Sequence, residues 1–328
     1  MAYSDHTFHI PVMGLAFTID TPVKVAPYGI SSVISIIEDS LVERMREYYY
    51  YTQLNELYIL IPLIDMDHRA KRITDYLNLV NRIVHEKFEH LKTKAFEKGS
   101  EIVKYFEMLP NDSKLKQLYH SMLEVTDSIQ KEKLQQKLRD KLVPGCIDVN
   151  IMTKLDKNQV DKDGNIIADG SDALTALRGY VNSDLTNSSI VFSAGMNPRL
   201  YNYMDNFEQF RTVKDGSFVK RIIIKVSDYR SSLIQGKFLA KKGLWVSEFR
   251  IESGLNCGGH AFATDGYLLG PILEEFKQKK QEMLNELFAL YTKALAEKGK
   301  EVPSEIPHTR ITVQGGIGTS EEDKFLLN

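Results

Sequence analysis

The octapeptide WVSEFRIE (residues 245–252) alternates charged and apolar side chains along a predicted strand. Glu248, Arg250 and Glu252 share one face, because successive side chains of a strand point to opposite sides. The same alternation recurs in residues 146–152, 221–227 and 310–314. Alternation usually marks one solvated face. Here amphipathic segments between the strands should cover the outer face, so the polar set is expected to point inward, paired with itself or with a ligand.

Strand and helix signals alternate along most of the chain, which indicates an α/β fold with parallel pairing. The predicted strands are residues 8–15, 31–37, 146–152, 189–194, 221–227, 245–252 and 310–314. Helical periodicity appears between them in residues 172–181, 199–207, 231–242 and 271–298. The charged inner face favours a closed TIM-type (β/α) barrel over an open doubly wound sheet, which has the same rhythm.

A long segment without strand signals interrupts this rhythm. It carries apolar residues at helical spacing and a turn with a capping residue at 110–113. We predict that residues 1–39 are the first part of a barrel, 40–143 an all-helical insertion, and 144–328 the rest of the barrel up to strand seven and its phosphate loop. The insertion either lengthens a crossover with solvated helices or binds a partner. Four tyrosines at its entrance, residues 48–51, form a packed hinge or a lid over a ligand.

Chain length adds a further expectation. Removing residues 40–143 leaves 224 of the 328 residues, whereas a typical barrel has about 250. Seven strands are predicted, and an eighth is needed for closure. We therefore expect the barrel to be incomplete at the C-terminus and the natural polypeptide to continue.

Composition excludes several functional classes. There are 42 Lys and Arg residues against 44 Asp and Glu, a formal net charge of −2, which gives no basic footprint for nucleic acid. Two cysteines cannot form a disulfide framework and favour a reducing compartment. The most apolar run, residues 57–64, is too short to cross a bilayer, and the N-terminus lacks a signal peptide. A cytoplasmic protein without nucleic-acid or membrane partners is expected.

Three glycine-containing segments follow predicted strands: residues 193–198, 253–260 and 314–319. Barrel active sites lie at these strand ends. In the third segment, Gly315, Gly316 and Gly318 precede Thr319, which begins a capping box. Free backbone amides at a helix start suit a cofactor phosphate. The alternative is a tight strand-to-helix turn, which needs only one or two glycines.

The second segment contains a candidate base. His260 follows two glycines, and a neutral imidazole is a natural general base near pH 7. Cys257 could be a nucleophile, although a small buried side chain is the better interpretation because no adjacent base is visible. No closely spaced cysteine pair accompanies the histidines, so no metal is expected.

Lys225 interrupts an apolar run in a strand that should be buried on both faces. A lysine in that environment needs an anionic partner. The partner is either a carboxylate such as Glu248 or Glu252, or a ligand phosphate or flavin.

Several short motifs resemble FMN-dependent nitronate monooxygenases, the 2-nitropropane dioxygenase-like barrels. CGGH (257–260) followed by LLGP (268–271) resembles their Gly-Gly-His motif and the Leu-Leu-Pro run after it, and QGGI (314–317) their phosphate loop. VNI (149–151) is similar to their flavin-contacting strand, VFSAG (191–195) to the strand before the lysine, and Lys225 falls on their strand lysine. The resemblance implies an FMN-binding TIM barrel with His260 as catalytic base. The implied cofactor-binding residues are Asn150, Lys225, Gly258, Gly259, Gln314, Gly315, Gly316, Ile317, Gly318 and Thr319.

Two departures bear on the substrate. Asn256 stands where the family usually has Glu, and the family lacks a long helical arm after strand two. We therefore expect an FMN-dependent oxidoreductase, nitronate monooxygenase-like or enoyl-reductase-like, that acts on a small carbon acid. The alternative is a non-catalytic flavin- or phosphate-binding module. In either case the helical insertion is a candidate for binding a protein partner or a second copy of the chain.

Overall fold

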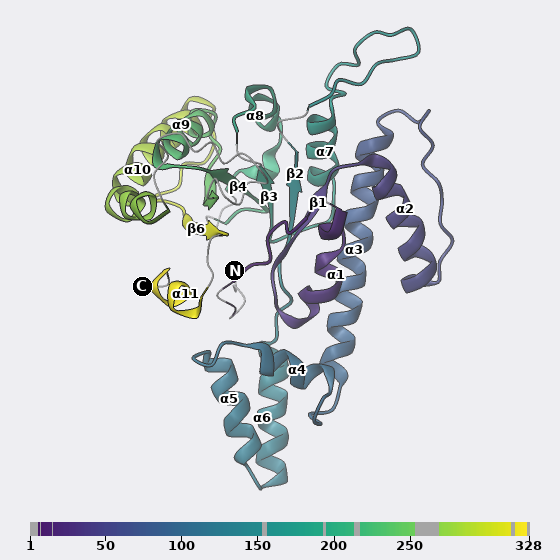
Figure 1. Cartoon of the computed structure of the whole chain (residues 1–328), viewed down its shortest axis with the longest axis vertical. Helices are drawn as coiled ribbons and strands as arrows, with labels where there is room; N and C mark the ends of the chain where they lie inside the picture. Colours follow the sequence, from purple (N-terminus) through teal and green to yellow (C-terminus); the bar gives the residue numbers. More distant parts are fainter. Residues whose placement is uncertain are drawn as a thin grey trace. The chain divides into compact units, whose positions relative to one another are not determined.

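The computed structural model describes residues 6, 8–14, 16–152, 156–192, 195–212, 217–252, 269–315 and 319–326. The fold is mixed α/β, with a six-stranded parallel sheet in the order β1-β2-β3-β4-β5-β6 (Figure 1). The strands are β1 Ser32–Ile36, β2 Ile147–Ile151, β3 Ser188–Phe192, β4 Lys220–Val226, β5 Val246–Glu252 and β6 Arg310–Gln314. Strands that are consecutive in the sequence are therefore neighbours in the sheet. Because they are parallel, each is joined to the next by a crossover connection.

Six of the seven predicted strands are confirmed, but the first is wrong. Within residues 8–14 only Ile10 forms a bridge, parallel to Ser32. Pro11 has no amide to donate to a ladder. The backbone N–H groups of Met13 and Gly14 donate to the Thr18 hydroxyl instead, at 3.3 Å each. These bonds turn the chain into the short helix Ala16–Thr18.

The chain divides into two compact units, residues 1–150 with 178–188 (unit 1) and residues 151–177 with 189–328 (unit 2). Unit 1 contains α1 Thr21–Val25, α2 Asp39–Tyr49, α3 His68–Thr93, α4 Glu101–Met108, α5 Lys114–Glu124 and α6 Ser128–Lys141. Unit 2 contains α8 Pro198–Met204, α9 Tyr229–Ala240, α10 Leu269–Glu297 and α11 Ser320–Leu326, and α7 Asp172–Val181 is divided between the units. None of the helices in the described part combines the length and hydropathy that crossing a membrane requires.

Unit 1 contains the helical segment predicted between strands two and three. Described residues 37–146 form helices and loops without a strand. The predicted stripe of α3 is buried, at Ile73, Leu77, Val80, Ile83 and Val84. A second apolar core joins the end of α3 to α4, α5 and α6, where Phe106 stacks on Tyr119. The hydroxyl of Ser113 accepts the amide hydrogens of residues 115 and 116, which confirms the predicted cap.

Of the four tyrosines, Tyr48 and Tyr49 end α2, and Tyr50 and Tyr51 begin a single π-helical turn, Tyr50–Leu54. Tyr49 is buried and donates to Asp20 at 2.9 Å, and Tyr50 donates to Asp75 at 3.1 Å. Tyr48 and Tyr51 are exposed. Two anchored hydroxyls support the hinge interpretation of this run.

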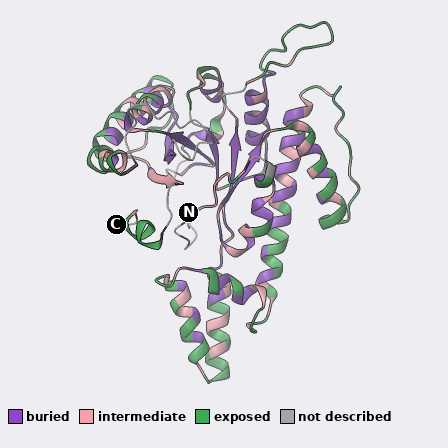
Figure 2. Ribbon diagram, viewed as in Figure 1, coloured by how far each residue is buried: buried purple, intermediate pink, exposed green. Residues whose placement is uncertain are grey.

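In unit 2, helices α9 and α10 lie side by side next to β4 and β5 (Figure 1). Their close approach depends on Gly236, where a Cβ would lie 2.9 Å from Leu287 and 3.2 Å from Phe249. Phe249 therefore marks the sheet face that the helices cover. All seven residues of β4 and of β5 are buried, as the purple arrows of Figure 2 show.

Candidate functional site

The charged side chains of β5 and β6, together with Lys225 of β4, lie on the face opposite Phe249. Parallel register places Arg310 beside Glu248, Thr312 beside Arg250, and Gln314 beside Glu252. On the other side, Lys225 of β4 is beside Arg250. The alternation seen in the sequence is therefore a structural property of three neighbouring strands. Because β4 and β5 are buried on both faces, these polar groups must satisfy one another or a ligand.

Glu248 lies toward the start of β5, at the centre of a group of polar contacts on this face, and is only 1% exposed. Its Oε1 atom accepts from Arg250 at 2.8 Å and from the Thr312 hydroxyl at 2.7 Å. Its Oε2 atom accepts from Arg310 at 2.7 Å. One carboxylate therefore holds two guanidinium groups and a hydroxyl on adjacent strands.

Lys225 and Glu252 form a second group of polar contacts on this face, at the carboxyl ends of β4 and β5. The Lys225 Nζ atom lies 3.5 Å from Glu252 Oε1, and both residues are buried. The side-chain amide of Gln314 donates to the same oxygen at 3.3 Å. The expected carboxylate partner of Lys225 is thus identified as Glu252. Two of the predicted cofactor-binding residues, Lys225 and Gln314, are brought together on this one carboxylate.

The described residues of this face carry an excess of positive charge. The cations that the strand register places there are Lys225, Arg250 and Arg310, and the carboxylates are Glu248 and Glu252. Cations therefore outnumber carboxylates by one (3 − 2). Charges in a buried environment interact more strongly than in water. Such a face suits a ligand that carries negative charge or develops it during a reaction.

Unit 1 has its own polar strand face on β2. Asn150 is buried and donates from Nδ2 to the Ser35 hydroxyl of β1 at 3.3 Å. Its Oδ1 atom is buried and has no hydrogen-bond partner in the described part of the chain. A buried amide oxygen without a donor is costly and fits a ligand that supplies one.

A histidine that the sequence patterns do not single out lies on the same face. His9 Nε2 lies 3.0 Å from Asp148 Oδ2, and Asp148 is buried on β2 two residues before Asn150. A signal was available, because a buried strand aspartate needs a cationic or donor partner. The partner lies 139 residues away in sequence, which no local pattern could indicate.

The predicted phosphate loop is described only at its two ends. Gly315 has a positive φ of 80°, which a side chain rarely adopts. The Thr319 amide donates to Glu322 Oε2 at 3.0 Å, and the Glu322 amide donates to the Thr319 hydroxyl at 3.2 Å. This reciprocal pair confirms the predicted capping box. It also means that the Thr319 amide is already satisfied by a carboxylate.

The remaining predicted residues lie outside the described part of the chain. They are His260, Gly258, Gly259, Gly316, Ile317, Gly318 and the neighbouring Cys257. Their assignment as base, cofactor-binding residues and buried thiol stays a prediction. Among the described residues, no group of three potential metal ligands occurs.

Comparison with known proteins gives no match: no family model fits the sequence, and no curated protein or solved structure is significantly similar. The functional argument therefore depends on the chemistry of the residues themselves.

Proposed function

We propose that this protein is an FMN-dependent oxidoreductase of the nitronate monooxygenase-like or enoyl-reductase-like type, acting on a small carbon acid. The observation that carries the proposal is the buried Lys225–Glu252–Gln314 cluster on a face with excess positive charge. We further propose that this face is the interior of a TIM-type barrel. Strands that follow one another in both sequence and space, with α9 and α10 on the opposite face, support that architecture.

The residues present fit the ring of FMN better than its phosphate. Lys225 of unit 2 supplies a buried cation. The assignment of Asn150 of unit 1 to the flavin comes from the resemblance alone. In contrast, Thr319 is already paired, and Glu321, Glu322 and Asp323 occupy the first turn of α11. Those three carboxylates oppose a second anion there. The phosphate end of the proposal therefore depends on the glycines at 315, 316 and 318 and on the resemblance.

Each residue has a distinct proposed role. When bound, FMN supplies the redox chemistry by accepting or donating two electrons. Lys225, held by Glu252, stabilises negative charge that develops nearby. Asn150 orients a ligand through its free oxygen. By the resemblance, His260 takes the proton from the carbon acid.

Removal of the Lys225 charge tests the proposal. Because Lys225→Met alone leaves Glu252 buried without its cation, the informative variant is Lys225→Met with Glu252→Gln. We expect the double variant to stay folded and to bind FMN at least about 10-fold more weakly, the equivalent of one lost charge-assisted hydrogen bond. The measurement is quenching of FMN fluorescence on titration with protein.

Lys237→Met is the matched control, since Lys237 pairs with Glu286 on the helical side of unit 2. It should leave FMN affinity unchanged. Wild-type protein that is colourless and cannot be reconstituted with FMN would refute the proposed cofactor. FMN that binds, but is bleached by a carbon acid equally well in wild type and His260→Asn, would refute the proposed base.

A second candidate function is a flavin-binding module without turnover whose helical arm binds a partner. The observation that favours it is a run of exposed apolar residues after α2. Bound FMN that no carbon acid bleaches would support this candidate over the enzyme.

A further inference from the structure

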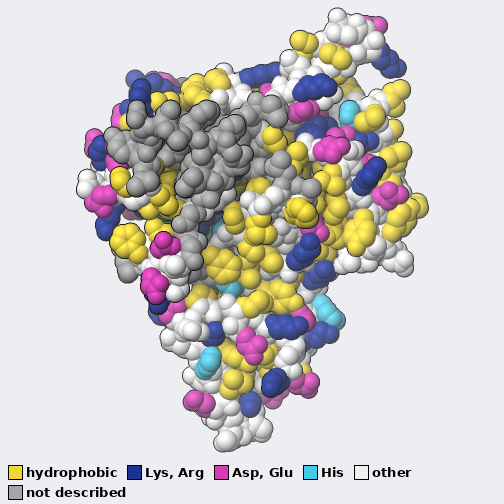
Figure 3. Space-filling view, in the orientation of Figure 1, with side chains coloured by type: hydrophobic (Ala, Val, Ile, Leu, Met, Phe, Trp, Pro, Cys, Tyr) yellow, Lys and Arg dark blue, Asp and Glu magenta, His cyan; other side chains and the backbone are white. Residues whose placement is uncertain are grey.

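Unit 1 exposes an apolar segment between α2 and α3, residues 57–66. Six of its large side chains are more than half exposed: Leu57 78%, Ile59 70%, Leu60 58%, Leu63 69%, Ile64 76% and Met66 86%. The corresponding loop beside α2 is drawn largely in green in Figure 2. Hydrophobic side chains gather along the same edge of the view in Figure 3. Monomeric proteins rarely expose contiguous apolar patches larger than a few hundred Å².

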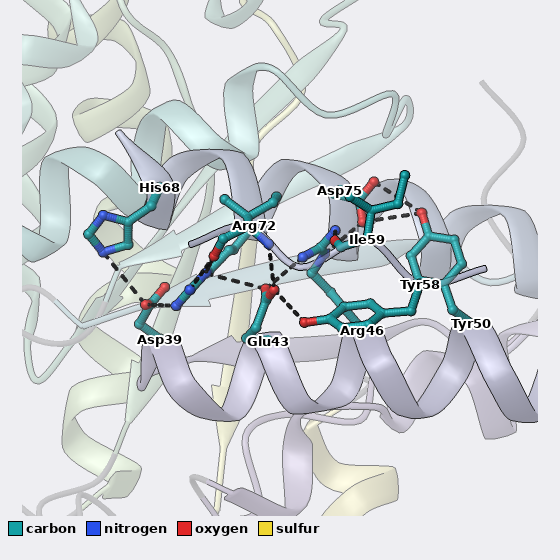
Figure 4. A network of polar contacts seen from close by, with 10 residues as sticks. Asp39, Glu43, Arg46, Tyr50, Tyr58, Ile59, His68, Arg72 and Asp75 are labelled. Atoms are coloured by element: carbon teal, nitrogen blue, oxygen red, sulfur yellow. Dashed lines mark hydrogen bonds and ion pairs between the residues drawn. The ribbon is translucent and has the colours of Figure 1, made fainter. Parts of the chain in front are cut away.

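A buried polar network holds the apolar segment in place (Figure 4). Glu43 of α2 accepts from the Tyr58 hydroxyl at 2.6 Å and from the Ile61 amide at 3.0 Å. Burial opposes ionisation of Glu43, but these bonds and the one from Arg46 hold its pKa below the ordinary value. The carboxylate therefore stays charged and keeps its hydrogen bonds near neutral pH.

Two buried arginines complete the network. Arg46 donates to Glu43 Oε2 at 2.6 Å and to the Ile59 carbonyl at 3.3 Å. Arg72 of α3 donates from Nε to the Ile61 carbonyl at 2.9 Å. Both arginines are at most 5% exposed. An exposed loop held by buried charges on two helices is preorganised, which lowers the entropic cost of binding.

The backbone bonds of the apolar segment leave one edge open. Ile59 and Ile61 direct their carbonyl groups to the arginines, at the two-residue spacing of an extended strand. The intervening Leu60 makes no backbone hydrogen bond in the described part of the chain. Its N–H and C=O groups are therefore available for pairing with another extended segment.

We propose that the apolar segment is the interface of a homodimer, in which residues 57–66 of one chain pack against the same residues of a second copy about a twofold axis. The six exposed side chains present on the order of 800 Å², the area that each partner contributes to a standard interface. Residues 57–64 contain no charge, and the one carboxylate of the segment, Asp65, is paired with Lys71 at 3.1 Å, so two identical surfaces meet with little repulsion. Self-complementarity of this kind is what a twofold interface requires.

Charge argues against a membrane as the occupant. Residues 47–68 contain four carboxylates, at positions 47, 56, 65 and 67, and no Lys or Arg. Three cations of α3 and α7 reach this stretch, and each is paired with one of those carboxylates: Lys71 with Asp65, Arg82 with Glu56 and Arg178 with Asp67. Segments that bind anionic lipid surfaces carry Lys and Arg beside their apolar residues. The proposal does not depend on FMN binding or catalysis.

The test is the mass of the full-length protein in solution, measured by light scattering and by sedimentation at tens of micromolar. The wild type should be a dimer. The double variant Leu60→Glu with Ile64→Glu should weaken dimerisation by at least about 30-fold and run as a monomer. Both positions are exposed, so the circular dichroism spectrum of the double variant should match that of the wild type.

Ile129→Glu is the matched control, because Ile129 is 65% exposed on α6 of the same unit. It should remain dimeric. A monomeric wild type, or a double variant that stays dimeric, would overturn the proposal. Wild-type protein that remains monomeric and floats with anionic lipid vesicles would identify the surface as a membrane-binding one and would also overturn it.

Discussion

Replacement of Glu248 by Ala is expected to lower the free energy of unfolding by about 3–5 kcal/mol, the usual cost of removing one partner from a buried ion pair. Among the described residues, Glu248 accepts from Arg250, with a guanidinium nitrogen 2.7 Å from its carboxylate, and it also accepts from Arg310 and Thr312. Its removal leaves a buried guanidinium without compensation. The measurement is urea denaturation followed by circular dichroism.

Two further variants separate charge from packing. Glu248→Gln keeps an acceptor oxygen but loses the charge, so its unfolding free energy should lie between those of the wild type and Glu248→Ala. Glu297→Ala removes an exposed carboxylate on α10 that is 3.9 Å from Lys293, and it should change stability by less than about 0.5 kcal/mol. If Glu248→Ala proved as stable as Glu297→Ala, the network around Glu248 would not stabilise the sheet.

Gly145→Ala is expected to destabilise the protein by about 3 kcal/mol or more, or to prevent folding. A Cβ at this position would lie 2.1 Å from the Ile30 carbonyl oxygen and 2.7 Å from the Ser31 nitrogen. Both are backbone atoms just before β1, so rotation of a side chain cannot relieve the clash. The Gly145 amide also donates to the Ala26 carbonyl at 2.8 Å. Relief of the clash would therefore separate the two segments that lead into β1 and β2.

Gly270→Ala is the comparison variant, because nothing lies within 4 Å of a Cβ at Gly270 in the first turn of α10. Alanine favours a helix over glycine, so stability should stay equal or rise by up to about 1 kcal/mol. The measurement is the melting temperature of each variant, which should be clearly lower for Gly145→Ala than for Gly270→Ala. Equal values would mean that the chain before β2 can shift away from Ile30 at little cost.

Local patterns in the sequence predicted much of this fold. Period-two alternation located β2 and β4–β6, and the burial of their polar residues was expected from the helices between them. Helical spacing located α3, α7, α9 and α10. Ser113 and Thr319 were identified as caps, since capping depends on residues within one turn. Lys225 was expected to pair with a carboxylate such as Glu248 or Glu252, or with a ligand phosphate or flavin, and its Nζ atom lies 3.5 Å from Glu252.

Long-range contacts could not be predicted in the same way. His9 and Asp148 are 139 residues apart, and the strand expected around His9 shortens to a bridge at Ile10. Residues 57–64 are the most apolar run of the chain, yet all of them except Tyr58 and Ile61 are exposed. Hydropathy measures a preference for burial but does not say whether anything covers a side chain.

The sequence by itself determined the α/β architecture with parallel strands and the alternation of polar and apolar residues along β4–β6. Those properties follow from side-chain periodicity and from short-range backbone sterics. Only the tertiary structure decided which charges pair, that Glu252 rather than Glu248 holds Lys225, and that Glu43, Arg46 and Arg72 fix an exposed apolar segment. These outcomes depend on register and on the packing of helices far apart in the chain, which residue spacing alone does not encode.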